Sequence, residues 1–240
     1  MKVFIIIPAA GLGTRMSGGK RHTPSKQFTH IGGTPILIRT LRCFGLRTDV
    51  DQIIVALREN EIANFKPVVA AESFANKVKL VAGGENRQDS VYNALSQIEA
   101  AADDVVLVHD GVRPFAEKKM IADVIAASRK YGAAIAGVPA LDTIKLVERS
   151  SENAVVTSTI PRERVVMAQT PQGARFAILR EAFASARADG FTGTDEASLI
   201  ERAGHTVGVV MGSYKNIKIT TPADIEIAEM YARAAAGEEE

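Results

Sequence analysis

Short apolar runs alternate with amphipathic segments along the first 138 residues, and this rhythm restricts the fold more than any other feature of the chain. Mostly apolar runs predict strands at residues 3–7, 52–57, 77–82, 104–109 and 133–138. Apolar residues spaced three and four apart predict helices at residues 35–46, 90–100 and 118–132. Strands that are apolar on both faces and joined by helices form a parallel sheet with helices on each side. We therefore expect an α/β fold of three layers with a mainly parallel sheet.

The pattern changes after Pro139. Alternating residues at 143–148 and 154–160 flank the turn-rich segment RSSEN and predict a protruding β-hairpin. Helical and strand patterns then resume, with a helix at 174–186, a helix that opens at Thr194 or Asp195, the run TVGVVM, the run NIKIT and a C-terminal helix that opens at TPAD. The stretch around Pro67 gives no clear prediction. At about 150 residues per domain, the length favours one large domain over residues 1–240, with the hairpin as an appendage.

Composition excludes several classes of protein. Hydrophobic residues make up 46% of the chain and charged residues 24%, which is ordinary for a globular domain. The single cysteine, Cys43, rules out a disulfide framework and a thiolate zinc cluster, so a reducing, cytoplasmic location is expected. The opening apolar run is shorter than a signal-peptide core, and no run approaches the roughly 18 residues that span a bilayer. We expect no membrane partner.

Positive charge is concentrated near the N-terminus. The net charge is only +1, but no acidic residue precedes Asp49, whereas eight basic residues do: Lys2, Arg15, Lys20, Arg21, Lys26, Arg39, Arg42 and Arg47. This asymmetry favours an anionic ligand near the N-terminus, and a solvated basic surface is the alternative. Nucleic acid is not favoured, because the chain has no Trp, 5% aromatic residues and no basic run interleaved with stacking rings.

The segment PAAGLGTRM, residues 8–16, follows the first predicted strand directly. Gly11 and Gly13 permit a close backbone approach, so their amides are suited to cradle phosphates, and Arg15 adds positive charge. Met16 stands where a dinucleotide fingerprint needs its third glycine, and the segment does not match a Walker loop either. A simple tight turn is the alternative reading.

Two further segments carry candidate chemistry. Lys20, Arg21 and Lys26 lie among turn-forming residues, in a loop suited either to close over a polyphosphate or simply to face solvent. Asp110 stands where an apolar strand ends, at the edge of the sheet where open α/β proteins bind ligands. A carboxylate there is placed to hold Mg²⁺ together with phosphate oxygens, or else to cap the loop or pair with Arg113. The four histidines have no metal-ligand spacing.

Several segments together resemble a known family. PAAGLGTRM, KQF, HDGVRPF, LDTIK, QTPQ, TDEAS and NIKIT occur in the order of the 2-C-methyl-D-erythritol 4-phosphate cytidylyltransferases of the non-mevalonate isoprenoid pathway. The resemblance runs from about residue 3 to about residue 231. It implies a nucleotidyltransferase-type fold, CTP and methylerythritol phosphate as substrates, a requirement for Mg²⁺, and a homodimer joined through a β-arm at residues 141–165.

The resemblance also implies roles for individual residues. Arg15 and Lys26 match the pair that stabilises the transition state, and Asp110 matches the magnesium-site carboxylate. The positions that match nucleotide-binding residues are Ala9, Ala10, Gly11, Gly13, Gly84, Glu85, Arg87 and Ser90. The positions that match residues holding or orienting methylerythritol phosphate are Asp110, Arg113, Thr143, Arg162, Thr170, Thr194 and Lys218, of which Arg162 and Lys218 aim the incoming phosphate. Two positions depart from the family pattern, because Ser25 stands where proline usually precedes the lysine and Glu85 where aspartate is frequent.

Three other functions compete with this one. Ribitol 5-phosphate cytidylyltransferases share GTRM, LDTI and NIKITTP, but PAAG after the first strand favours methylerythritol. A nicotinamide-dependent oxidoreductase uses the same strand and glycine loop, but here the third glycine is missing. A non-catalytic nucleotide-binding regulator is expected to have lost Arg15, Lys26 or Asp110, and all three are present.

Overall fold

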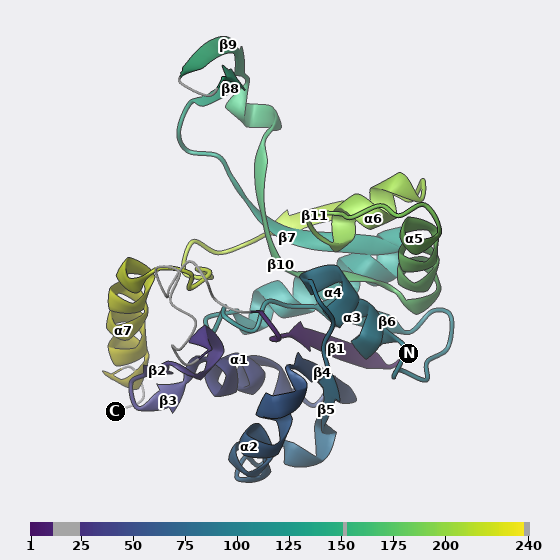
Figure 1. Cartoon of the computed structure of the whole chain (residues 1–240), viewed down its shortest axis with the longest axis vertical. Helices are drawn as coiled ribbons and strands as arrows, with labels where there is room; N and C mark the ends of the chain where they lie inside the picture. The colour runs from purple at the N-terminus through teal and green to yellow at the C-terminus, as the bar shows by residue number, and fades with distance from the viewer. Residues whose placement is uncertain (12–24, 151–152, 238–240) are drawn as a thin grey trace.

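A mixed β-sheet forms the centre of the molecule (Figure 1), whose computed structural model describes residues 1–11, 25–150 and 153–237. In spatial order its strands are β11 (Gly208–Met211), β7 (Ala133–Pro139), β10 (Val166–Arg175), β6 (Val105–Val108), β1 (Val3–Pro8), β4 (Gln52–Leu57) and β5 (Val78–Ala82). Strand β10 runs antiparallel to β6 and β7, and the other pairs are parallel. The predicted α/β fold with a mainly parallel sheet is confirmed.

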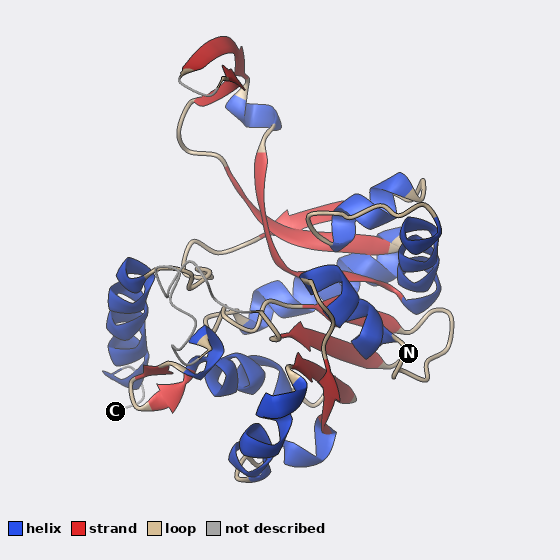
Figure 2. Cartoon of the chain, viewed as in Figure 1, coloured by secondary structure: helices blue, strands red, loops and turns tan. Residues whose placement is uncertain are grey.

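Helices cover both faces of the sheet (Figure 2). Successive residues of β1 point to opposite faces, so Ile5 and Ile7 belong to one buried cluster and Phe4 and Ile6 to the other. The first cluster packs against α1 (Ile36–Gly45), α2 (Glu59–Ala70) and α4 (Lys118–Tyr131). The second packs against α3 (Arg87–Leu95), α5 (Phe176–Ala188) and α6 (Glu196–Arg202). Because both faces of β1 are buried, its sequence is continuously apolar, and this short apolar run is the feature that predicted the strand.

The remaining elements are short or peripheral. They are η1 (Lys26–Phe28), β2 (His30–Ile31), β3 (Thr34–Pro35), η2 (Ala75–Lys77), η3 (Arg162–Arg164) and α7 (Pro222–Gly237). Helix α7 packs over the side of the molecule that carries β2 and β3 (Figure 1). Among the described residues, no helix is both long enough and apolar enough to cross a bilayer.

Several elements differ from the sequence-based expectations or were not predicted. The helix expected at residues 90–100 spans Arg87–Leu95 as α3. Strand β10 was not predicted, because Gln169, Pro171 and Gln172 interrupt its apolar pattern. Helix α5 begins at Phe176 rather than at residue 174, since Arg175 still pairs with β6. Helix α2 continues through Pro67, which costs it one backbone hydrogen bond without ending it.

The run NIKIT at residues 216–220 is not a strand, although its apolar alternation resembles one. The side-chain hydrogen bonds and packing of buried residues hold this segment in place, rather than the backbone hydrogen bonds of a β-sheet. The Asn216 Nδ2 atom donates to the Thr170 carbonyl at 2.8 Å and to Gln169 Oε1 at 3.2 Å. The Ile219 amide donates to the Val112 carbonyl at 3.0 Å, and the Ile219 side chain is fully buried. These two anchors fix the position of Lys218 between them.

The predicted hairpin is present and projects away from the body of the molecule (Figure 1). Strand β8 (Ile144–Arg149) pairs antiparallel with β9 (Ala154–Ile160), and this pair forms its own two-stranded sheet. Its apolar side chains are largely uncovered, with Leu146 at 53%, Val155 at 65% and Val156 at 56% exposure. A two-stranded ribbon with so little buried surface is marginally stable by itself.

We predict that Asn216→Ala lowers the free energy of unfolding by about 1–3 kcal/mol, because it leaves the buried Thr170 carbonyl without its donor. Urea denaturation measures this change. Lys215→Ala is the matched control, since Lys215 is exposed and its replacement should alter stability by less than about 0.5 kcal/mol. Equal stabilities for the two variants would show that the segment is held in some other way.

Candidate active site

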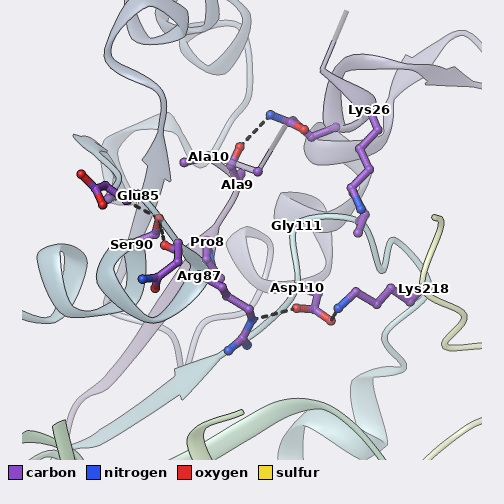
Figure 3. Close-up of a pocket in the computed structure, with 15 residues that line it drawn as sticks. Pro8, Ala9, Ala10, Lys26, Glu85, Arg87, Ser90, Asp110, Gly111 and Lys218 are labelled. Atoms are coloured by element: carbon purple, nitrogen blue, oxygen red, sulfur yellow. Dashed lines mark hydrogen bonds and ion pairs between the residues drawn. The ribbon is translucent and has the colours of Figure 1, made fainter. Parts of the chain in front are cut away.

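A cavity of about 210 Å³ opens at the carboxyl ends of β1 and β6. From β1 the chain adds β4 and then β5 toward one edge of the sheet. It then crosses back and places β6 next to β1 on the opposite side of that strand, so the strand order reverses between β1 and β6. Ligands of open α/β proteins bind at such points. The cavity is lined by residues 8–11 after β1, residues 84–87 and Ser90 around the start of α3, residues 110–112 after β6, and Lys26, Gln27 and Lys218 (Figure 3).

Two glycines allow the loops of the cavity to lie directly against each other. A Cβ atom on Gly83 would stand 2.5 Å from the Cβ of Ala10, and one on Gly84 would stand 2.3 Å from the Cβ of Asp89. Both separations are far shorter than atomic contact permits. The Gly84 amide donates to Ser90 Oγ at 3.0 Å, which closes the turn onto the first residues of α3. A larger residue at either position would push the wall of the cavity outward.

Asp110 is the electrostatic centre of the cavity. Its side chain is buried, and three cationic side chains from different parts of the chain surround it. The Arg113 Nε and Lys218 Nζ atoms lie 3.1 Å and 3.0 Å from Oδ2, and the Arg87 Nε atom lies 3.4 Å from Oδ1. Figure 3 shows Arg87 and Lys218 reaching Asp110 from opposite sides.

These neighbours keep the Asp110 carboxylate ionised. Burial alone would raise the pKa of Asp110, but the positive charges of Arg87, Lys218 and Arg113 outweigh it and hold the pKa well below its usual range. The backbone is fixed as well, because the Asp110 amide donates to Thr170 Oγ1 at 3.0 Å. The site therefore presents a fixed anion within a ring of cations. A metal ion could replace a cationic side chain beside the carboxylate, and a phosphate could pair with the cationic side chains in place of the carboxylate.

Arg87 forms a second ion pair, with Glu196, in addition to its contact with Asp110. The guanidinium Nη1 and Nη2 atoms donate to the two carboxylate oxygens of Glu196 at 2.7 Å and 2.9 Å, a bidentate pair. Glu196 is only 2% exposed and is the first residue of α6. Burial lowers the pKa of Arg87, and the charges of Glu196 and Asp110 more than reverse that effect, so its pKa is raised and the side chain stays charged. Glu196 thereby sets where Arg87 stands beside Asp110.

The residues that the sequence singled out do not all lie in the cavity. Ala9, Ala10, Gly11, Lys26, Gly84, Glu85, Arg87, Ser90, Asp110 and Lys218 line it, and Arg113 and Thr170 contact Asp110. Thr194 is exposed and immediately precedes Asp195, the N-cap of α6. Thr143 and Arg162 belong to the exposed arm, where the Arg162 Nη1 atom donates to the Leu141 carbonyl at 3.0 Å. Gly13, Arg15, Lys20 and Arg21 lie outside the described residues.

His109 supports the structure rather than facing a ligand. It is fully buried against the Phe44 ring, with 4.9 Å between ring centroids, and its Nε2 atom lies 3.0 Å from the Arg113 carbonyl. Burial lowers the pKa of His109 to about 4. The neutral ring therefore helps to fix the turn that carries Asp110 and Arg113.

Sequence reasoning missed several residues that shape this site. Glu196 lies inside the quoted segment TDEAS, but nothing in its spacing revealed that it would pair with Arg87. Gln172 lies inside the segment QTPQ, but neither its strand β10 nor its contacts with α6 were predicted. Its Nε2 atom donates to Oδ2 of Asp195, the N-cap of α6, at 2.9 Å, and its Oε1 atom accepts from the Ala197 amide at 3.0 Å. Both are long-range contacts between elements that a linear pattern does not connect.

Comparisons with known proteins agree with this geometry. The family model for 2-C-methyl-D-erythritol 4-phosphate cytidylyltransferase (IspD) matches residues 3–234. The protein of that name from Acidobacterium capsulatum is 57% identical over 97% of this chain and 98% of its own, and the one from Bacillus mycoides is 47% identical over 95% and 96%.

Solved structures agree as well. The 4-diphosphocytidyl-2C-methyl-D-erythritol synthase of Anaerococcus prevotii superposes with a TM-score of 0.82 at 30% identity, covering 97% of this chain and 98% of its own. The 2-C-methyl-D-erythritol 4-phosphate cytidylyltransferase of Thermus thermophilus gives a TM-score of 0.75 at 35% identity, covering 97% and 100%. With its fold, its cavity at the switch point and these matches over nearly its whole length, the chain belongs to the 2-C-methyl-D-erythritol 4-phosphate cytidylyltransferase family.

Proposed function

We propose that this chain transfers the cytidylyl group of CTP to 2-C-methyl-D-erythritol 4-phosphate and releases pyrophosphate. The observation that carries this function is the ionised Asp110 among three cations, at the end of a glycine-lined cavity in a chain of this family. The cavity is small and polar at one end, which suits a nucleotide whose triphosphate extends toward the cations.

The nucleoside end of CTP is assigned to the wall formed by residues 9–11 and the start of α3. Ala10, Gly84 and Ser90 line that wall, and none of their side chains carries a charge. Glu85 lines the cavity beside them, in place of the aspartate that is frequent in the family. This division leaves the charged side of the cavity for phosphates.

The transfer step needs charge stabilisation more than proton transfer. An oxygen of the acceptor phosphate attacks the α-phosphorus of CTP, the new P–O bond forms, and the bond from that phosphorus to the oxygen of the leaving pyrophosphate breaks. No general base is needed, because a phosphate monoester is already anionic at neutral pH. Lys26 lines the cavity and is assigned, together with Arg15, to stabilise the charge that develops around the α-phosphorus.

Asp110 fits a magnesium site. Mg²⁺ favours one or two carboxylates together with phosphate oxygens and water, and Asp110 supplies one carboxylate that its cationic neighbours keep ionised. Within residues 1–11, 25–150 and 153–237, no cluster of three or more acidic, His or Cys side chains could hold a metal without a substrate. When bound, the ion would neutralise charge on the triphosphate, and Asp110 is the residue that would hold it.

The acceptor phosphate is assigned to Lys218, Arg113 and Thr170 on one side of Asp110, together with Thr194 just before the α6 cap. Arg162 and Thr143 are assigned to the same substrate from the arm of a second copy. Neither residue lines the cavity of its own chain, and the arm over residues 141–165 exposes apolar side chains that a partner would cover. A closed twofold dimer is the commonest oligomer, and it would bury these apolar side chains against a second copy of the chain.

The substrate assignment is tested by supplying CTP and Mg²⁺ with either 2-C-methyl-D-erythritol 4-phosphate or ribitol 5-phosphate and measuring pyrophosphate release. We expect release with the methylerythritol substrate and a much lower kcat/KM with the ribitol one. A preference for ribitol 5-phosphate would contradict the proposal and identify the chain as a ribitol 5-phosphate cytidylyltransferase.

We predict that Lys26→Ala lowers kcat by about a hundredfold to a thousandfold and changes the KM for CTP far less, because it removes a group that acts on charge present only in the transition state. Steady-state kinetics with varied CTP measures both. Lys66→Ala, an exposed lysine of α2, is the control and should leave both values near those of the wild type. A retained kcat with a raised KM would make Lys26 a ground-state phosphate binder instead.

A mixed-dimer experiment tests the arm. If Arg162 completes the site of the other subunit, a heterodimer of Arg162→Ala and Lys26→Ala chains has one site with both lesions and one with neither. Two nearly inactive proteins should then recover about half of the wild-type rate per purified heterodimer. No recovery in heterodimers verified by two affinity tags would show that each site is built within one subunit.

A further inference from the structure

The segment that carries Lys26 is fastened on both sides of the lysine to one carboxylate. Glu61, in the first turn of α2, accepts a hydrogen bond from Ser25 Oγ at 2.5 Å and a longer one from Gln27 Nε2 at 3.4 Å. Ser25 is 7% exposed and Gln27 2% exposed, so both donors are removed from water. The three side chains form a bracket that we call the Glu61 clamp.

The clamp also reaches the nucleotide-binding loop. The Gln27 Nε2 atom donates to the Ala9 carbonyl at 2.6 Å, so one amide group bonds to the loop after β1 and to Glu61. The guanidinium of Arg58, the N-cap residue of α2, donates to the carbonyls of Ala10 at 3.2 Å and Gly11 at 3.3 Å. The first turn of α2 therefore ties together the loop that lines the nucleoside end of the cavity and the segment that carries Lys26.

Lys26 needs such an external support because its own element is short. Helix η1 spans only three residues, and the hydrogen bonds from the Phe28 amide to Ser25 and from the Thr29 amide to Lys26 complete its turns. A 3₁₀ turn of this length has poor internal hydrogen-bond geometry and does not define its own position. Figure 3 shows Lys26 extending into the cavity from this segment, near the loop that carries Ala9 and Ala10.

We propose that Glu61 is a positioning residue for the transfer reaction: through Ser25 and Gln27 it sets the distance between Lys26 and the α-phosphate of a nucleotide seated on residues 9–11. This inference rests on the proposed role of Lys26. Glu61 does not line the cavity, so its effect on the reaction passes through the clamp. A displacement of about 1 Å at a catalytic group costs up to about a hundredfold in rate, which sets the scale expected here.

The test is a double-mutant cycle with Glu61→Ala and Lys26→Ala. Glu61→Ala should lower kcat by about tenfold to a hundredfold while the KM for CTP changes less than about threefold. In the Lys26→Ala background the same substitution should change kcat by less than about twofold, because the group it positions is gone. Equal fold losses in both backgrounds would overturn the proposal.

Two further variants separate positioning from folding. Glu59→Ala is the matched control, since Glu59 is exposed and lies in the same first turn of α2, so it shares any effect on the helix terminus but belongs to no clamp. Ser25→Ala removes one of the two hydrogen bonds without altering α2 and should give a smaller loss of kcat in the same direction. A kcat for Glu59→Ala as low as that of Glu61→Ala would assign the loss to the helix rather than to the clamp.

Hydrogen exchange gives a readout that needs no substrate. Glu61→Ala should accelerate exchange at the Phe28 and Thr29 amides by about tenfold or more, and Glu59→Ala should not. If exchange is accelerated in Glu61→Ala but the wild-type protein shows no activity on CTP, the proposed function is contradicted and the structural role of the clamp is supported. If exchange is unchanged and Glu61→Ala lowers kcat by the same factor in the wild-type and Lys26→Ala backgrounds, the positioning role of Glu61 is contradicted. The proposed function is then unaffected.

Discussion

A buried carboxylate with three cationic neighbours is the constraint on which the rest of the site depends. Asp110 stays ionised in a buried position only because Arg87, Arg113 and Lys218 surround it, and each of these comes from a different part of the chain. Leaving any one charge unpaired in such a position is costly, so the elements that supply them must meet there. The sheet provides that meeting point by reversing its strand order beside β1.

Much of the remaining structure holds these charges in place. Glu196 at the start of α6 orients Arg87, and buried Asn216 fixes the irregular segment that carries Lys218. The bulged strand β10 supplies Thr170, whose hydroxyl accepts from the Asp110 backbone. The opposite wall of the cavity is organised in the same way by the first turn of α2. Asp110 and Lys218 therefore lie in irregular segments, whereas Glu196 and Asn216, which hold the surrounding charges in place, lie at a helix terminus and in a buried contact.

Sequence patterns predicted what is local or continuous and missed what is assembled from a distance. The buried strands β1 and β4 were found because short, continuous apolar runs between amphipathic segments are typical of buried parallel strands, and Asp110 was found because it ends such a run. Strand β10 escaped because Pro171 and its polar neighbours break the pattern, although its partners on both sides supply the ladder. The pairing of Arg87 with Glu196 joins residues 109 positions apart, and no periodicity encodes such a contact.

A crystal structure with CTP and Mg²⁺ tests the central role of Asp110 most directly. We expect an Asp110 carboxylate oxygen about 2.0–2.1 Å from the ion, triphosphate oxygens on the same ion, and at least one of the three cationic side chains moved from the carboxylate to a phosphate. A bound nucleotide whose metal is held away from Asp110, with Arg87, Arg113 and Lys218 all still on the carboxylate, would contradict this role. In that case Asp110 would serve only to organise the surrounding charges.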